Sequence, residues 1–171
     1  MKPLPELIEP VLAAVVLIAA VTDLKRREIP NWLTLGAILA GLGLHTWLRG
    51  WEGLKFSAAG LGLAALIFVP LFVMRWLGGG DVKLMGAVGA LAGAQNMFVI
   101  FVLDAILGGI AALVLVIVRG RFLRTLRNIP RMFRFQRESE LEAGGEKSLG
   151  LPRAVTIAAA TLLVLWASTR G

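Results

Sequence analysis

The sequence predicts an all-α integral membrane protein with about six transmembrane helices and an amphipathic helix on the membrane surface. Hydrophobic residues make up 57% of the 171 residues and charged residues 17%, whereas soluble domains are about 45–50% apolar and about 25% charged. The mean hydropathy is +0.79, and the apolar residues form long runs. Because nothing resembles a linker, we expect one transmembrane domain over residues 1–171.

A membrane-spanning helix needs about 20 mostly apolar residues. The segments that meet this requirement are approximately 4–22, 32–48, 54–77, 82–95, 97–118 and 150–168. The first is read as a retained helix and not a signal peptide, because Glu6 and Glu9 interrupt its approach and no A-x-A cleavage site precedes Asp23. The fourth is short, so it starts below the membrane surface or is completed by the glycines before it.

The distribution of lysine and arginine predicts the orientation. The 18 basic residues divide 14 to 4 between the loops on the two sides of the predicted spans. Cytoplasmic loops carry the excess of basic residues, so the loop over about 119–149 is cytoplasmic and both termini lie outside the cytoplasm. An even number of spans agrees with that placement.

The cytoplasmic loop contains the stretch "RFLRTLRNIPRMFRFQR", in which arginines recur every three or four residues and apolar residues share another face. This pattern predicts an interfacial helix on the inner leaflet, kinked at Pro130, with anionic lipid as its partner. The net charge of +7 and the pI of 11.1 are typical of such basic loops, so we expect lipid contact and not nucleic-acid binding.

The sequence lacks the residues that several classes of catalytic site require. The chain has no cysteine, which excludes disulfides, thiolate zinc sites and cysteine nucleophiles. The H-E-x-x-H zinc-peptidase motif is absent, and we expect no metal and no cofactor. His45 and Ser57 lie near one outer turn, but no G-x-S-G motif surrounds Ser57, which disfavours a serine protease.

Two acids lie at the predicted membrane boundary, Asp23 at the cytoplasmic end of the first span and Asp81 at the cytoplasmic start of the fourth. Two carboxyl groups a few ångströms apart share a proton, because both cannot ionise. The ionised one can activate water and the protonated one can polarise a peptide carbonyl, as in aspartic proteolysis. Alternatively, each acid caps a helix end, Asp23 near Lys25 and Arg26, and Asp81 as an N-cap.

Glycines surround the second acid. Gly78, Gly79 and Gly80 leave bare backbone before Asp81, which permits positive φ and close approach by another chain. The G-x-x-x-G step from Gly89 to Gly93 predicts tight packing of the fourth span against a neighbouring helix.

These stretches carry a family resemblance. "GGGDVKLMGAVGALAG" resembles the GxGD motif of type IV prepilin peptidases, with Gly78, Gly80 and Asp81 at the motif positions and Lys83 continuing it. "DLKRREIPNWLT" resembles the family's first-acid motif, with Asp23 as the acid. Pro30 and Asn31 follow it at the family's spacing. The resemblance covers roughly residues 10–95; in the last span, Arg153 stands where the family has an aromatic or small residue.

The resemblance implies an intramembrane aspartic endopeptidase of the bacterial inner membrane, with Asp23 and Asp81 as catalytic residues on the cytoplasmic side. It also implies a prepilin-like substrate with a short basic leader, a glycine before the cut and a hydrophobic helix after it. The larger members carry cysteine pairs associated with methylation. The chain therefore resembles the small, peptidase-only branch that serves tight-adherence (Flp-type) pili. The sequence does not indicate an oligomeric state.

Asp104 is expected to stand apart from the two acids. Counted back from Arg119 at about 1.5 Å per residue, it lies about 22 Å from the cytoplasmic edge. We expect it to bond Gln95 or Asn96 near the outer surface, with a proton relay as the alternative. Two other functions remain open: a non-catalytic subunit of a pilus or secretion assembly, and a small proton-coupled transporter that uses Asp81 or Asp104.

Overall fold

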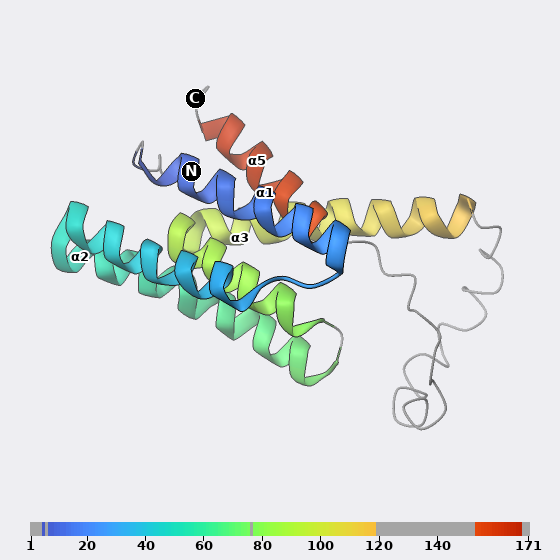
Figure 1. The fold of residues 1–171 in the computed structure, drawn as a ribbon, viewed down its shortest axis with the longest axis horizontal. Coiled ribbons are helices and arrows are strands. Elements are labelled where there is room, and N and C mark those ends of the chain that lie inside the picture. Colours follow the sequence, from blue (N-terminus) through green and yellow to red (C-terminus); the bar gives the residue numbers. More distant parts are fainter. Residues whose placement is uncertain (1–4, 6, 76, 119–152, 169–171) are drawn as a thin grey trace. The chain divides into compact units, whose positions relative to one another are not determined.

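A computed structural model of the chain describes residues 5, 7–75, 77–118 and 153–168. Most of the described residues are helical and none forms a strand, so the all-α part of the predicted fold class is confirmed (Figure 1). The helices are α1 (Ile8–Arg26), α2 (Asn31–Val73), α3 (Gly79–Val118) and α5 (Arg153–Ser168). The interfacial helix predicted over 119–149 lies outside the described residues.

A glycine interrupts each of the two long helices. Gly50 has φ 57° and ψ −137°, and Gly93 has φ 76° and ψ 168°. Glycine adopts positive φ without the steric cost that a Cβ imposes. Figure 1 shows α2 and α3 each doubling back on themselves. The helical segments are therefore 8–26, 31–49, 51–73, 79–92, 94–118 and 153–168, within a few residues of the predicted ones.

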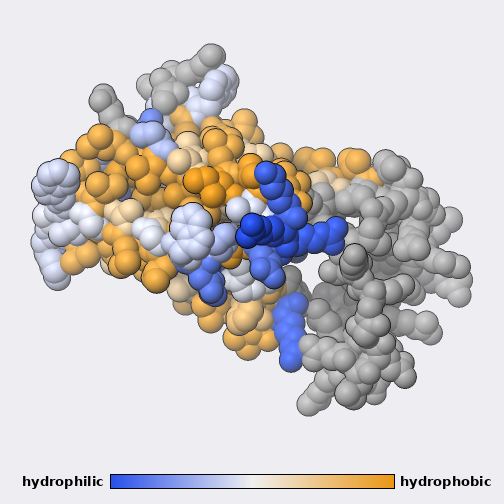
Figure 2. All heavy atoms as spheres, viewed as in Figure 1, coloured by the Kyte–Doolittle hydropathy of each residue, from blue (hydrophilic) through white to orange (hydrophobic). Residues whose placement is uncertain are grey.

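Much of the described surface is apolar. Figure 2 shows hydrophobic residues over most of the visible face, with hydrophilic residues gathered toward one end. By length and composition, the described part contains two helices able to cross a membrane, Asn31–Val73 and Gly79–Ala111. Large exposed hydrophobic residues such as Leu39 and Leu66 lie along the first of these. A surface of this kind is compatible with a membrane protein.

The chain divides into two compact units, Met1–Leu107 with Pro152–Gly171, and Gly108–Leu151. The features described below belong to the first unit. Within it, α1 packs against α5 and also contacts α2. The two helices bury faces with helical spacing, so their apolar stripes meet. The buried residues include Leu12, Val16 and Ala19 of α1, and Ile157, Thr161 and Val164 of α5.

Small residues bring α2 and α3 into backbone contact. A Cβ added at Gly60 would overlap the carbonyl group of Gly89, and one added at Gly89 would overlap that of Gly60. A Cβ at Gly41 would lie only 2.8 Å from the carbonyl oxygen of Ala90. Residues 84–93 are buried throughout. The predicted close packing of the fourth helical segment is confirmed, and its partner is α2.

This contact predicts a difference between two glycines of the same helix. Gly60→Ala should lower the free energy of unfolding by about 1–3 kcal/mol, because the methyl group forces the two backbones apart. Gly62→Ala is the matched control, since a Cβ there meets nothing within 4 Å, and it should be neutral or slightly stabilising. Thermal unfolding in detergent measures both. Equal melting temperatures would contradict the proposed contact.

Candidate active site

Asp23 lies in the last turn of α1 and reaches the start of α5. Its backbone carbonyl accepts the N–H of Arg27 at 2.8 Å, where the chain leaves the helix in a left-handed conformation, φ 54°. Its side-chain Oδ2 accepts the N–H of Ala154 at 3.1 Å. The first N–H groups of a helix have no partner within the helix, so Asp23 caps α5. Helix capping was one expectation for this acid, but the capped helix is distant in sequence.

Asp81 is held at the beginning of α3 by a reciprocal pair of bonds with Gly78. Its N–H donates to the Gly78 carbonyl at 3.2 Å, and its carboxyl accepts the N–H of Gly78. This is the arrangement of a capping box, in which the third helical residue reaches back to the cap. A Cβ at Gly78 would lie 3.5 Å from Asp81 Oδ2. Glycine therefore leaves this side of the carboxyl uncovered.

Gly78, Gly79 and Gly80 do not adopt the positive φ that glycine permits. Among the described glycines, only Gly50 and Gly93 have positive φ, because α3 already begins at Gly79 and its first turn is helical. A Cβ at Gly80 would lie 3.5 Å from the side chain of Ile29, and one at Gly79 would lie 3.4 Å from Phe72. These are ordinary van der Waals separations, so the glycine segment lies beside the residues that precede α2 and beside the last turn of α2.

The two sequence motifs meet through their polar residues. Lys83 Nζ donates to Asn31 Oδ1 at 2.9 Å. Pro30 precedes α2 in an extended conformation, φ −62° and ψ 133°, and its carbonyl accepts the N–H of Leu33 at 3.2 Å. Since Asn31 opens α2 and Lys83 lies in α3, this bond ties the helix starts together. The carboxyl groups of Asp23 and Asp81 also act on each other electrostatically.

The structure brings Asp104 to this same end, so its predicted isolation is wrong. Its charge acts on Asp81, and its carboxyl lies near Thr156 and Arg153 of α5 instead of the expected Gln95 or Asn96. The physical reason is the reversal at Gly93. Asp81 precedes this glycine by twelve residues and Asp104 follows it by eleven, so each lies about 17 Å from the reversal along its helix.

Arg153 opens α5 and carries a positive charge toward these acids. Its guanidinium acts electrostatically on Asp81 and on Asp104. The sequence marked Arg153 only as a departure from the family's pattern, because nothing local reveals which side chains it meets. A signal was nevertheless available in the sequence. Arg153 follows Pro152 at a helix start, where a positive charge is unfavourable because it opposes the helix dipole. Nearby acidic side chains would offset that cost.

The side chains of His45 and Ser57 bond carbonyl groups at the C-terminal end of the first segment of α3. Ser57 Oγ donates to the Ala90 carbonyl at 2.6 Å, and His45 Nε2 bonds the Leu91 carbonyl at 2.9 Å. A carbonyl oxygen only accepts, so Nε2 carries the proton. These carbonyls lack helical partners because the helix breaks at Gly93. Both hydrogen-bonding side chains are thereby committed to the backbone, which gives them a structural role and not that of a nucleophile and its base.

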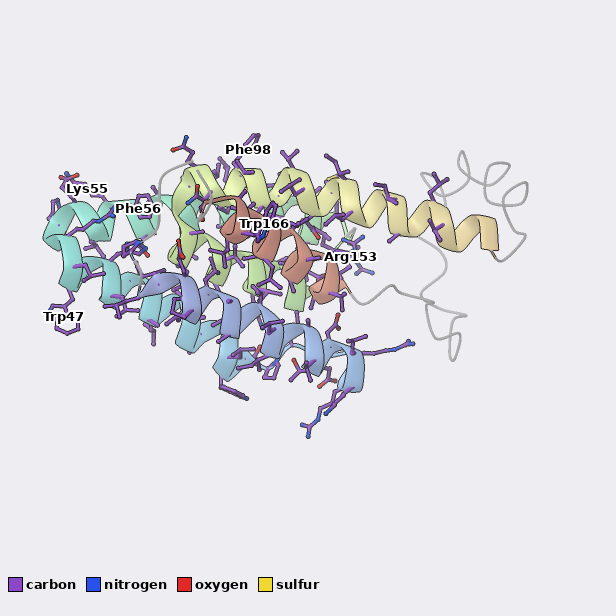
Figure 3. All side chains as sticks on the ribbon, turned by 90° about the horizontal axis from the view of Figure 1, so that it is seen from above. Trp47, Lys55, Phe56, Phe98, Arg153 and Trp166 are labelled. Carbon is purple, nitrogen blue, oxygen red and sulfur yellow. The ribbon has the colours of Figure 1, made fainter. Side chains whose placement is uncertain are left out.

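Figure 3 shows this second cluster and the start of α5 at opposite ends of the helices. Phe56, whose ring centroid lies 4.9 Å from that of His45, and Arg153 are drawn at opposite ends of the helices. The Phe56 ring also occupies the space that a side chain at Gly93 would need. Within the described residues, no group of three or more His, Cys, Asp or Glu side chains is arranged to hold a metal ion.

The fold and the site define a helical protein that brings Asp23 to the start of α5 and places Asp81 in the first turn of α3. The type IV leader peptidase family matches residues 10–113, a stretch that contains Asp23, Asp81 and Asp104. This chain belongs to the type IV leader peptidase family. No solved structure matches it.

Three relatives show how far the similarity extends. A prepilin leader peptidase/N-methyltransferase of Legionella pneumophila is 32% identical over 123 residues, 68% of this chain and 43% of that protein. A prepilin peptidase of Methanocaldococcus jannaschii is 29% identical over 50% of this chain and 24% of its own length. A preflagellin peptidase of Methanococcus voltae is 35% identical over 44% and 34%. The chain thus spans less than half of each relative.

The role of Ser57 predicts a loss of stability on truncation. Ser57→Ala should lower the free energy of unfolding by about 1–3 kcal/mol, because the buried Ala90 carbonyl loses its donor. Thr46→Ala is the control: its exposed hydroxyl bonds the Leu42 carbonyl within its own helix, so its removal should cost little. Thermal unfolding of both variants provides the measurement. If Ser57→Ala were as stable as the control, the Ala90 carbonyl would not depend on this hydroxyl.

Proposed function

We propose that this chain is an intramembrane aspartic endopeptidase that removes the basic leader from prepilin-like proteins, with Asp23 and Asp81 as its catalytic residues. The observation that supports this proposal is that the two motif acids, which come from helices far apart in sequence, act on each other electrostatically. Family membership supplies the reaction class, and the names of the relatives indicate leader peptides as the substrate.

The chemistry follows from a shared proton. Two neighbouring carboxyl groups carry one negative charge between them. The ionised carboxyl takes a proton from water as the water oxygen attacks the scissile carbonyl carbon. The protonated carboxyl donates to the carbonyl oxygen. Collapse of the tetrahedral intermediate then breaks the C–N bond, and the leaving nitrogen takes up a proton. The products are the free leader and the shortened protein, with no cofactor consumed.

The groups around Asp23 and Asp81 stabilise a negative charge. Asp23 receives an N–H from the start of α5, and Asp81 receives one from the start of α3. Both helix starts present the positive end of the helix dipole, and Arg153 adds a full positive charge. Gly78 leaves one side of Asp81 free of side chains. An extended substrate backbone could approach the carboxyl from that side.

The proposed setting is a six-span domain in the bacterial inner membrane, with the acids at the cytoplasmic face and both termini outside. Exposed tryptophans support this: Trp32 is 70% exposed near one end of the first segment of α2, and Trp47 is 82% exposed near the other. Tryptophan is enriched at both membrane–water interfaces. Exposed Lys25, Arg26 and Arg27 lie at the acid end, as expected for a cytoplasmic face.

The proposed substrate has a short basic leader, a glycine at the cut and a hydrophobic helix after it, and prepilins of tight-adherence (Flp-type) pili are the class to test first. The hydrophobic helix would lie in the membrane beside the apolar surface of the enzyme. For the arginine-rich segment 119–149 we propose contact with anionic lipid, because basic amphipathic segments bind the negatively charged inner leaflet.

Replacement of either acid should abolish cleavage. Asp23→Asn and Asp81→Asn retain the shape of the carboxyl but cannot take a proton from water, so the general base is lost. The double variant should be hardly worse than either single one, because the two acids act as a unit. Co-expression with a candidate prepilin, scored by the mobility shift on leader loss, measures this outcome.

The matched control is Glu52→Gln, an exposed acid paired with Lys55 at 2.8 Å, which should leave cleavage intact. Cleavage at nearly wild-type rate by either aspartate variant would refute the paired-carboxylate mechanism. Disappearance of both variants from the membrane would favour an assembly subunit. A protein that moved protons and cleaved no prepilin would be a transporter.

The orientation is tested by labelling in intact cells. Cysteines introduced as Ser139→Cys in the basic loop and Ser168→Cys at the end of α5 should differ in access to an impermeant thiol reagent. Only the second should react, because the 14-to-4 division of basic residues places the loop inside the cell. The native chain has no cysteine, so the background is low. Labelling at position 139 alone would reverse the proposed orientation.

A further inference from the structure

The segment that joins α1 to α2 is short and fixed at both ends. Arg27 adopts a left-handed conformation, φ 54°, and its N–H donates to the Asp23 carbonyl at 2.8 Å. Pro30 is extended, φ −62° and ψ 133°, and α2 begins at the next residue, Asn31. Residues 27–30 therefore hold the start of α2 close to the end of α1, because an extended chain reaches only about 3.3–3.6 Å per residue.

This connection contacts the start of α3 on both sides of Asp81 in the sequence. A Cβ added at Gly80 would lie 3.5 Å from the side chain of Ile29, an ordinary van der Waals separation. Lys83 Nζ donates to Asn31 Oδ1 at 2.9 Å. The first contact is made by the residue before the acid, and the second by the residue two positions after it. The start of α3 is therefore held against the α1–α2 connection at the place where its acid lies.

The Asn31 side chain serves this contact and not its own helix. An asparagine at a helix start usually accepts an N–H of the same helix, but the start of α2 has no side-chain cap bond. Asn31 and Lys83 are both exposed. A hydrogen bond formed at the surface replaces bonds to water, so it adds little to the free energy of unfolding. Its effect is on placement, because it selects one position of α3 along the start of α2.

We propose that Lys83 and Asn31 are positioning residues for the acid pair. Their hydrogen bond fastens the start of α3 to the start of α2 and so sets the position of Asp81 relative to Asp23. This inference rests on the proposed function. Neither residue touches the reacting atoms. Lys83 bonds an amide oxygen of α2, and the chain leads back from Asn31 through residues 27–30 to the helix that carries Asp23.

The test is steady-state cleavage of a purified prepilin by the full chain in detergent. Lys83→Met and Asn31→Ala should each lower kcat about tenfold with KM nearly unchanged, because a small misplacement of a reacting group slows chemistry without weakening substrate binding. The double variant should be no slower than the slower single variant, since both break the same bond. Lys83→Arg and Asn31→Asp should keep most of the rate, because arginine still donates and a carboxylate still accepts.

Lys55→Met is the matched control. Lys55 Nζ donates to Glu52 Oε1 at 2.8 Å, also at an exposed site, and Figure 3 shows Lys55 and Arg153 at opposite ends of the helices. Its kcat should equal that of the wild type. A wild-type kcat in Lys83→Met would overturn the inference. So would a rise in KM at constant kcat, which would make Lys83 a substrate-binding residue, or a double variant whose loss equals the product of the two single losses.

A second readout does not depend on activity. The Asp81 N–H donates to the Gly78 carbonyl at 3.2 Å, and hydrogen exchange at this amide should become faster in Lys83→Met and stay unchanged in Lys55→Met. The reason is that only the first variant frees the start of α3 to open locally. Unchanged exchange in Lys83→Met would overturn the inference even if the rate fell. Failure of the proposed function is separately visible, because the wild-type chain would not cleave or Asp81→Asn would cleave normally.

Discussion

The contact between the backbones of Gly60 and Gly89 is the interaction on which the arrangement of this unit depends. It allows the first segment of α3 to lie directly against α2, with no side chain between them. At such a separation, Ser57 and His45 can reach the Ala90 and Leu91 carbonyls. These are the carbonyls that the break at Gly93 leaves without helical partners. Packing and hydrogen bonding therefore depend on the same pair of glycines.

The reversal at Gly93 transmits this constraint to the acids. Because α3 turns back at one residue instead of through a loop, the positions before and after the turn are matched in depth. Asp81 and Asp104 consequently reach the same level, where the charge of Asp104 acts on Asp81. A longer connection would have allowed the two segments to slide along each other and would have separated these acids. The turn thus determines which charges meet.

At the end of the unit that holds the acids, helix N-termini stabilise negative charge, a role that cations often have in soluble proteins. Asp23 accepts the Ala154 N–H in the first turn of α5, and Asp81 accepts the Gly78 N–H that precedes α3. Helix N-termini stabilise negative charge through unpaired N–H groups and through the dipole. Backbone donors of this kind are rigid, so they orient a carboxyl more narrowly than a flexible lysine. This explains how acids can be kept both near hydrocarbon and in a defined geometry.

The helices and most of the site residues could be predicted from the sequence because hydrophobicity and motif spacing are local properties. Segments such as 31–49 and 94–118 follow from runs of apolar residues, which must be helical wherever lipid provides no hydrogen bonds. The spacing of Gly80 and Asp81, and of Pro30 and Asn31, was readable for the same reason. Asp104 was misplaced because its depth was counted from Arg119 and not from the reversal at Gly93.

The sequence by itself determined the all-helical fold, the two motif acids and the family they indicate. The tertiary structure decided which groups those acids meet: the Ala154 N–H for Asp23 and Gly78 for Asp81. It also brought Asp104 to the same end of the unit. It also decided that His45 and Ser57 bond the Leu91 and Ala90 carbonyls before the break at Gly93. The physical reason is that hydrophobicity and helix formation act over a few neighbouring residues, whereas a hydrogen bond between helices depends on the turn geometry and backbone separation of all the segments between its partners.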